Sequence, residues 1–317
     1  DLREPNQITL SCDLSRLLPE TDPYARQIML SHGTFLELLD IAARELGLRA
    51  EIELFPAGRF GPRHLDTRPL ARIRLSPDSR VEKDALFAQI LRRRTNRSPY
   101  GSARNLPQAA WQTIVQSPAE NAIQIGYVDL AQPSLLAQHR QIAAAAWQTE
   151  LTTPPVVRET YRLLRIGADE IDKHRDGIAI LDSRLLWLDR LGLFDRTRVP
   201  AADSYTTQSQ LEEFAARLAA TPAFFWMSSR GNDRVTQVAA GRAYARVQLT
   251  ATALGVAMQP LQQALQEYPE QQSHYQAIHK LCGADPATQT IQMWARVGYG
   301  PPVSPSPRRP LEQIIRP

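Results

Sequence analysis

Four arginines lie within the segment LRRRTNRSPY at residues 91–100. Guanidinium groups donate forked hydrogen bonds to phosphate or carboxylate oxygens, and Thr95, Asn96 and Ser98 add hydroxyl and amide groups beside them. A short amphipathic helix is predicted to run from Asp84 into the arginines, where cations would complement the helix dipole. The segment is therefore interpreted either as a solvated helix end or as a binding site for one small anion.

A second basic cluster lies near the other end of the chain, where Arg308 and Arg309 stand between prolines in SPRRPLEQII (306–315). The flanking prolines stiffen the segment, and the apolar Leu311 and Ile314 that follow could anchor it to a core. A solubilising tail is the simpler interpretation. If the two clusters meet in the fold, however, they could hold one dianion between them.

Other patterns that carry chemistry are missing from the sequence. His274 and His279 are five residues apart and belong to no HExxH or Cys/His set, so no metal site is predicted. The sequence has no GxSxG, GxGxxG or Walker A motif. The arginines at 92–97 are not interleaved with aromatic residues, and a net charge of +4 is mild for this length, so nucleic-acid binding is disfavoured.

Composition indicates a folded protein of two coupled domains, with 317 residues of which 43% are hydrophobic and 22% charged. No apolar run reaches the length of a transmembrane helix, so no membrane partner is expected. Spacing alone leaves open whether Cys12 and Cys282 pair. The chain begins abruptly just before a strand-like ITLSC, and we expect that a segment upstream has been removed. The compartment, cytoplasmic or periplasmic, stays open.

Hydrophobic periodicity predicts an α+β chain. Strands are expected at 8–14, 50–56, 70–75, 123–128, 223–229 and 291–300. Helices are expected at 24–46, 84–94 and 241–255 and over most of 130–220, with a linker at 76–80. A loop is expected after the helix at 241–255, in VAMQPLQQAL, and the proline-rich tail is expected to be extended.

Two of the predicted helices resemble each other. SHGTFLELLDIAARELG (31–47) aligns without a gap with AAGRAYARVQLTATALG (239–255), which pairs Gly33 with Gly241 and Gly47 with Gly255. A strand-like segment follows each copy. We therefore expect an internal duplication in which each half contributes one central helix to a pseudo-symmetric whole.

Together these segments resemble FMN-dependent nitroreductases. RRRTNRSPY is similar to the Arg-Arg-Ser-x-Arg-type segment of that family, GRAYARVQLTATALG to its central helix, and VGYGPPVSPSPRRPLEQII to its closing strand and phosphate-binding tail. SRLLPETDPYARQIMLSHGTFLELLDIAARELG, followed by a second copy, resembles the fused Acg-like branch. In that branch one chain holds two nitroreductase-like halves and imitates the usual homodimer.

The resemblance implies a nitroreductase-like α+β fold, with a mixed, mostly antiparallel sheet wrapped by helices. It places an N-terminal half at 1–80 and a C-terminal half at 81–317, with a helical lid-like insertion at about 130–210. FMN would bind at the junction of the halves. The chain would act as a monomer that imitates a dimer, or as a weak homo-oligomer.

Site residues follow from the resemblance position by position. Arg93, Arg94 and Thr95 match positions that contact the FMN phosphate and ribityl chain, and Arg97 matches the basic position at the flavin pyrimidine edge. Arg308 and Arg309 match basic residues on the phosphate, whereas Gln259, Pro260 and Leu261 match the loop that passes flavin N5. No acid, base or nucleophilic side chain is implied as catalytic.

The sequence departs from the family pattern in two places. The N-terminal half has no arginine segment and no basic tail of its own, so one flavin site per chain is expected. The family's Asn-x-Gln-Pro-Trp segment should precede ITLSCDL and is not in the sequence, which implies weaker FMN binding or loss of the cofactor.

The favoured hypothesis is an FMN-dependent oxidoreductase that uses NAD(P)H to reduce nitroaromatics or quinones as small-molecule electron acceptors. The alternative is a protein that binds or sequesters flavin without turnover, which the long insertion and the single site would suit. Nucleic-acid binding by the arginines is a third and disfavoured reading.

Overall fold

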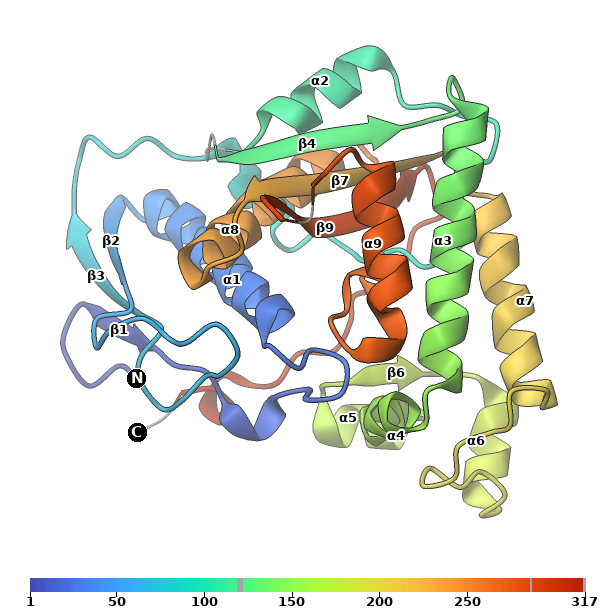
Figure 1. The fold of residues 1–317 in the computed structure, drawn as a ribbon. Coiled ribbons are helices and arrows are strands. Elements are labelled where there is room, and N and C mark those ends of the chain that lie inside the picture. Colours follow the sequence, from blue (N-terminus) through green and yellow to red (C-terminus); the bar gives the residue numbers. More distant parts are fainter. Residues whose placement is uncertain (119–121, 286, 316–317) are drawn as a thin grey trace.

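The first part of the chain forms a small antiparallel sheet beside one long helix. The computed structural model describes residues 1–118, 122–285 and 287–315. Strands β1 (Gln7–Leu10), β3 (Ala71–Pro77) and β2 (Leu48–Leu54) pair in the order β1-β3-β2. Helix α1 (Arg26–Glu45) lies beside this sheet (Figure 1) and packs its apolar face on it, with Met29, Leu36 and Ile73 in the shared core.

The second part is built on a four-stranded antiparallel sheet with helices on both faces. Its order is β4 (Ile123–Val128), β7 (Ala223–Arg230), β9 (Gln289–Gly298) and β8 (Ala257–Pro260). Side chains alternate between the faces as a strand requires. Phe225 and its neighbours pack with α8 (Arg234–Ala253) and α2 (Gln108–Gln116), while Phe224 and Trp294 pack with α3 (Pro133–Thr152), α7 (Tyr205–Ala219) and α9 (Gln272–Leu281).

A smaller layer lies between α3 and α7 in the sequence. It contains α4 (Pro154–Arg162), β5 (Leu164–Ile166), α5 (Ala168–His174), β6 (Ile178–Ile180) and α6 (Ser183–Arg190), and β5 and β6 pair in parallel. The Glu159 carboxylate accepts hydrogen bonds from the backbone N–H groups of Glu20 and Thr21, and Arg16 pairs with Asp176. These contacts tie the layer to the first part of the chain.

Helices α1 and α8 lie against each other (Figure 1), and they cross at two glycines. A Cβ built on Gly33 would lie 2.1 Å from the carbonyl oxygen of Val238, and one built on Gly241 would lie 2.0 Å from that of Leu30. Gly33 aligns with Gly241 and Leu30 aligns with Val238, so the two contacts are reciprocal. Each helix approaches the other through equivalent residues, and only glycine permits this distance.

The same reciprocity extends to two buried arginines at the starts of these helices. Arg26, the first residue of α1, donates to the backbone carbonyls of Leu265 and Gln292 in the second part. Arg234, the first residue of α8, donates to the carbonyls of Tyr24 and Gly61 in the first part. The two arginines are equivalent in the alignment of the helices.

The surroundings of the two helices also correspond. The order β1-β3-β2 has its counterpart in β7-β9-β8, and β2 and β8 each follow directly on the long helix of their part. Gly47 and Gly255, which end the aligned segments, have φ values of +68° and +69°, the left-handed conformation typical after a helix. The α+β class and the mostly antiparallel sheet are confirmed.

The predicted strands at 50–56, 70–75, 123–128, 223–229 and 291–300 are confirmed as β2, β3, β4, β7 and β9, and the helices at 24–46 and 241–255 as α1 and α8, which begins earlier, at Arg234. The strand predicted at 8–14 was too long, since β1 ends at Leu10 and a 3-10 helix begins at Leu14. The helical prediction for 130–220 missed β5 and β6, because three residues are too few to show alternation.

Three local predictions need correction or comment. The helix predicted from Asp84 is only a 3-10 helix at Ala85–Gln89, and Leu91, expected on its apolar face, is 85% exposed. The arginines that follow thus stand on no α-helix whose dipole they could complement. The loop predicted after α8 begins with β8. The tail lacks regular structure before a 3-10 helix at Leu311–Gln313, and its end at 316–317 lies outside the described residues.

The remaining short helices are of the 3-10 type. They lie at Leu14–Arg16, Gln263–Leu265 and Pro269–Gln271. The last two follow β8 and lead the chain into α9.

Candidate functional site

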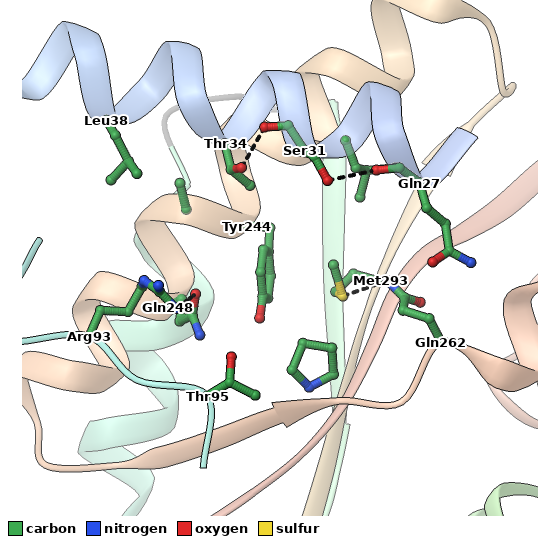
Figure 2. Close-up of a pocket in the computed structure, with 13 residues that line it drawn as sticks. Gln27, Ser31, Thr34, Leu38, Arg93, Thr95, Tyr244, Gln248, Gln262 and Met293 are labelled. Carbon is green, nitrogen blue, oxygen red and sulfur yellow. Dashed lines mark hydrogen bonds between the residues drawn. The ribbon is translucent and has the colours of Figure 1, made fainter. Parts of the chain in front are cut away.

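A cavity of about 330 Å³ opens beside the crossing of α1 and α8. One wall is the face of α1 that carries Gln27, Ser31 and Thr34, and the other is formed by Tyr244 and Gln248 of α8 (Figure 2). The segment 93–95 and the strands β8 and β9 complete it. The volume lies within the range of small-molecule and cofactor sites. The cavity is thus assembled from both parts of the chain.

Arg93 brings a positive charge to this cavity without a matching negative one. Its guanidinium donates to Oε1 of Gln248 at 3.3 Å, and no carboxylate pairs with it among residues 1–118, 122–285 and 287–315. Burial lowers the pKa of Arg93, and the nearby Arg308 and Arg94 lower it further, although Tyr244 acts in the opposite direction. An anion in the cavity would offset both the desolvation of the buried guanidinium and its repulsion by the neighbouring arginines.

Three polar side-chain atoms around the cavity are buried without a hydrogen-bond partner in the described part of the chain: Oη of Tyr244, Nε2 of Gln248 and Oε1 of Gln262. Each such atom costs about 1–3 kcal/mol unless a ligand or water satisfies it. Burial raises the pKa of Tyr244, so its hydroxyl stays protonated and can donate. Together with Arg93, these two donors and one acceptor fit a ligand that combines an anionic group with several polar atoms.

The structure brings together three of the nine residues that the resemblance implied. Arg93 and Thr95 (Figure 2) line the cavity, and so does Pro260. The guanidinium of Arg94 donates to the backbone carbonyls of Leu91 and Arg93, beside the cavity rather than in it.

Gln259 and Leu261 lie on β8 and directly after it, not in a free loop. The side chain of Gln259 accepts a hydrogen bond from Arg296 at 2.7 Å, and the buried Leu261 donates its N–H to the carbonyl of Trp294. Neither residue is among those that line the cavity. Because Pro260 lies between them on a pleated strand, it faces the other way and reaches the cavity.

Arg97 and Arg308 line a second cavity of about 800 Å³, which lies between α5, β6 and the tail. More than a third of Arg97 is exposed, yet partial burial still lowers the pKa of its guanidinium, and Arg217 lowers it further. Arg308 also lowers the pKa of Arg93, so the tail comes close to the first cavity. Arg309 is partly buried in the same tail.

Sequence reasoning missed the polar residues of the two helices. Gln27, Ser31 and Thr34 recur at helical spacing on α1, and Tyr244 and Gln248 do so on α8. A polar stripe on an otherwise buried helix is a signal for a ligand, and it could have been seen in the aligned segments. Gln262, after β8, carries no such signal.

The described residues hold no group of three or more histidine, cysteine or acidic side chains placed to bind a metal ion. In the same residues no helix is both long and apolar enough to cross a membrane. Cys12 and Cys282 form no disulfide with each other.

Comparison with known proteins decides the family. No family model matches the sequence. The chain is 30% identical over 322 residues to two Mycobacterium tuberculosis proteins, from strains H37Rv and CDC 1551, each named "Putative NAD(P)H nitroreductase". The alignment covers 98% of this chain and 83% of each relative. The chain belongs to the nitroreductase family. The resemblance stated from the sequence is confirmed at this level.

Solved structures similar to this nitroreductase are more distant. The FMN- and NADPH-dependent nitroreductase NfnB from Sphigopyxis sp. strain HMH is 14% identical, with a TM-score of 0.43, and the match covers 74% of this chain and 98% of that one. NfnB from Mycobacterium smegmatis, in complex with NADPH, is 16% identical with a TM-score of 0.41, and the match covers 72% and 95%. The family assignment rests on the mycobacterial relatives.

Proposed function

We propose that this nitroreductase binds one FMN in the cavity between α1 and α8 and passes electrons from NADH or NADPH to a nitroaromatic or quinone. Family membership supports the reaction class, since the relatives are named NAD(P)H nitroreductases. The observation that carries the site is the set of unsatisfied groups around it, namely the unpaired Arg93 and the partnerless polar atoms of Tyr244, Gln248 and Gln262.

The residues of the cavity suggest how FMN would be held. Arg93, with Arg308 and Arg309 of the tail, would bind the phosphate, because guanidinium groups bind phosphate with charge-assisted hydrogen bonds. The hydroxyl of Thr95 and the free donors of Tyr244 and Gln248 would meet the ribityl and ring oxygens. Bound flavin supplies the redox chemistry. The chain binds and orients it, and the close contact of α1 with α8 excludes water from one side.

We further propose that the two parts of the chain arose by duplication and that the Acg-like monomer imitates a dimer. The equivalent strand orders and the reciprocal contact of Gly33 with Gly241 support this, and so do the equivalent Arg26 and Arg234, each of which donates to backbone carbonyls of the other part. In a two-fold assembly equivalent residues contact each other across the axis. The halves would be 1–80 and 81–317.

The alignment also identifies the position of a second, symmetry-related site. Thr34 and Leu38 of the cavity correspond to Arg242 and Arg246, and Ala245 corresponds to Glu37. There the carboxylate of Glu37, which is 3% exposed, accepts from Arg242 at 2.8 Å and from Arg246 at 2.9 Å. This ion-pair cluster occupies the equivalent space. It supports the expectation of one flavin site per chain.

We assign the insertion at 130–210 to the second cavity rather than the first. The residues that it contributes there, from 168 to 181, face the tail and Arg97, whereas none of its residues lines the first cavity. The insertion would then shape the approach of the electron donor or acceptor. Arg97 would act in that approach, near the flavin pyrimidine edge.

The test is an anaerobic visible spectrum. Protein loaded with FMN should be yellow, and either NADH or NADPH should bleach it, after which a nitroaromatic or a quinone should restore the colour. Failure to bind added FMN would overturn the proposal. A yellow protein that neither nucleotide bleaches would instead indicate flavin sequestration without turnover.

A further inference from the structure

A third cavity, of about 460 Å³, lies inside the insertion, between α3, α4, α6 and α7. It shares no lining residue with the proposed flavin cavity. Its walls are mainly aromatic and aliphatic and include Trp147, Tyr161, Phe194, Tyr205 and Leu188. Small-molecule sites are typically apolar cavities of this size with a few polar groups that orient the ligand.

One buried carboxyl group stands in this apolar wall. Glu150 of α3 is 9% exposed, and its Oε2 accepts a hydrogen bond from Nε2 of Gln266 at 2.8 Å. Burial raises the pKa of Glu150 to about 7; hydrogen bonds from Gln266 and Gln263 oppose the rise, and the charge of Glu159 adds to it. A cation beside this carboxyl would favour its ionised form.

The other charged lining residues also make the cavity unsuitable for anions. Asp182 and Glu213 are acidic, with Asp182 capping α6 and Glu213 paired with Arg217. The positive Arg184 lies on an exposed part of α6. Among the charged lining residues that the structure describes, Glu150 alone is buried, whereas Asp182, Arg184 and Glu213 are exposed to solvent. An anionic ligand would be repelled and an ammonium group attracted.

Trp147 supplies a second observation that points to a ligand. The indole Nε1–H of this lining residue is buried and has no hydrogen-bond partner in the described part of the chain. The same is true of Oε1 of Gln266, whose amide nitrogen donates to Glu150. Aromatic rings attract both other rings and cations held over their faces. The wall thus offers ring contacts, an acceptor for a cation and unsatisfied polar atoms.

We propose that this cavity binds a small aromatic amine, with its ring packed against the contacting pair Tyr161 and Phe194, whose ring centroids lie 5.5 Å apart, and its ammonium group at the Glu150 carboxylate. The site is independent of flavin binding, because the two cavities have no residue in common.

Three isosteric probes test the proposal by calorimetric titration of the full chain: 1-naphthylmethylamine, 1-naphthalenemethanol and 1-naphthoate. The amine should bind roughly 10- to 100-fold more tightly than the alcohol, as expected for a charged hydrogen bond, and the carboxylate should not bind. No binding of the amine, or equal binding of the carboxylate, would overturn the proposal.

Three variants, one of them a control, locate the binding. Ser209→Trp on α7 places an indole in the cavity and should abolish amine binding, whereas Glu212→Trp, on an exposed position of the same helix, should leave it intact. Glu150→Gln keeps an acceptor for Gln266 and should bring the amine down to the affinity of the alcohol. Unchanged amine affinity in Glu150→Gln would contradict the site even if Ser209→Trp fails to fold. FMN affinity should stay the same in all three variants.

Discussion

Gly33 of α1 and Gly241 of α8 face each other so closely that a Cβ built on either would lie 2.9 Å from the Cα of the other. The two residues occupy the same place in the aligned helices. Their contact brings together the faces of α1 and α8 that form the proposed flavin cavity on one side and the Glu37 cluster on the other. The architecture of the site therefore depends on glycine, which has no side chain, at both positions.

Replacement of either glycine by alanine should destabilise the protein. The added methyl group would meet a backbone carbonyl oxygen at 2.0–2.1 Å, and a backbone cannot turn away as a side chain can. We expect Gly33→Ala and Gly241→Ala each to lower the free energy of unfolding by about 1–3 kcal/mol or more, measured by urea denaturation. Gly101→Ala is the control, because its methyl group would meet nothing closer than 3.8 Å. Equal stability of all three variants would refute the close crossing.

Loss of Arg93 should weaken FMN binding. The guanidinium is the unpaired cation of the cavity, so Arg93→Ala should cost about 1–3 kcal/mol, or roughly 5- to 150-fold in the dissociation constant. Arg309→Ala should have an effect of the same range if the tail reaches the phosphate. Arg92→Ala, an adjacent and exposed arginine, should change the constant little. Quenching of flavin fluorescence measures all three, and equal affinities would show that the phosphate binds elsewhere.

The sequence predicts the framework of this fold better than the site. Periodicity predicts the helices α1 and α8 and the strands that follow them. Alignment of the two helices shows that Gly33 and Gly241 are equivalent. Both signals can be read without knowledge of the tertiary contacts. Arg93, Thr95 and Pro260, which the resemblance implied as FMN contacts, line the cavity, and their contact with FMN stays a prediction. Their partners on α1 could not be assigned in the same way, since they come from the other part of the chain.

Tertiary contacts decide the remaining positions. Gln259 carries the right side chain for a ligand, yet the buried Arg296, which lies opposite it on β9, donates a hydrogen bond to its side-chain oxygen. The short 3-10 helix before Arg92 ends early although its sequence is helical in pattern, and its apolar Leu91 finds no core to pack on. Such outcomes depend on what lies across the fold, and one sequence does not contain that information.

Glu37 should contribute to stability but not to flavin binding. Removing its carboxylate in Glu37→Ala leaves Arg242 without its ion-pair partner and Arg246 with Asp84 alone. We expect a loss of about 1–3 kcal/mol in the free energy of unfolding and an unchanged FMN dissociation constant. Glu45→Ala, which removes an exposed pair with Lys83, should cost at most about 1 kcal/mol. A large change in FMN affinity in Glu37→Ala would contradict the assignment of this cluster to the side of the α1–α8 crossing opposite the flavin cavity.

Glu150 should make stability depend on pH. Burial raises its pKa from the ordinary 4.5 to about 7, so its contribution is fully present below pH 4.5 and is lost as pH rises through about 7. Between these pH values the wild type should lose on the order of 2–3 kcal/mol relative to Glu150→Gln, which cannot ionise. Urea denaturation of both proteins from pH 5 to 8 measures the difference, and parallel curves would contradict the buried carboxyl.

The most direct test of the account is an equilibrium titration of the full chain with FMN, followed by fluorescence. We predict saturation at one FMN per chain, with a dissociation constant that rises in Arg93→Ala and stays the same in Arg92→Ala. Saturation at two FMN per chain, or no binding at all, would contradict a single flavin site between α1 and α8.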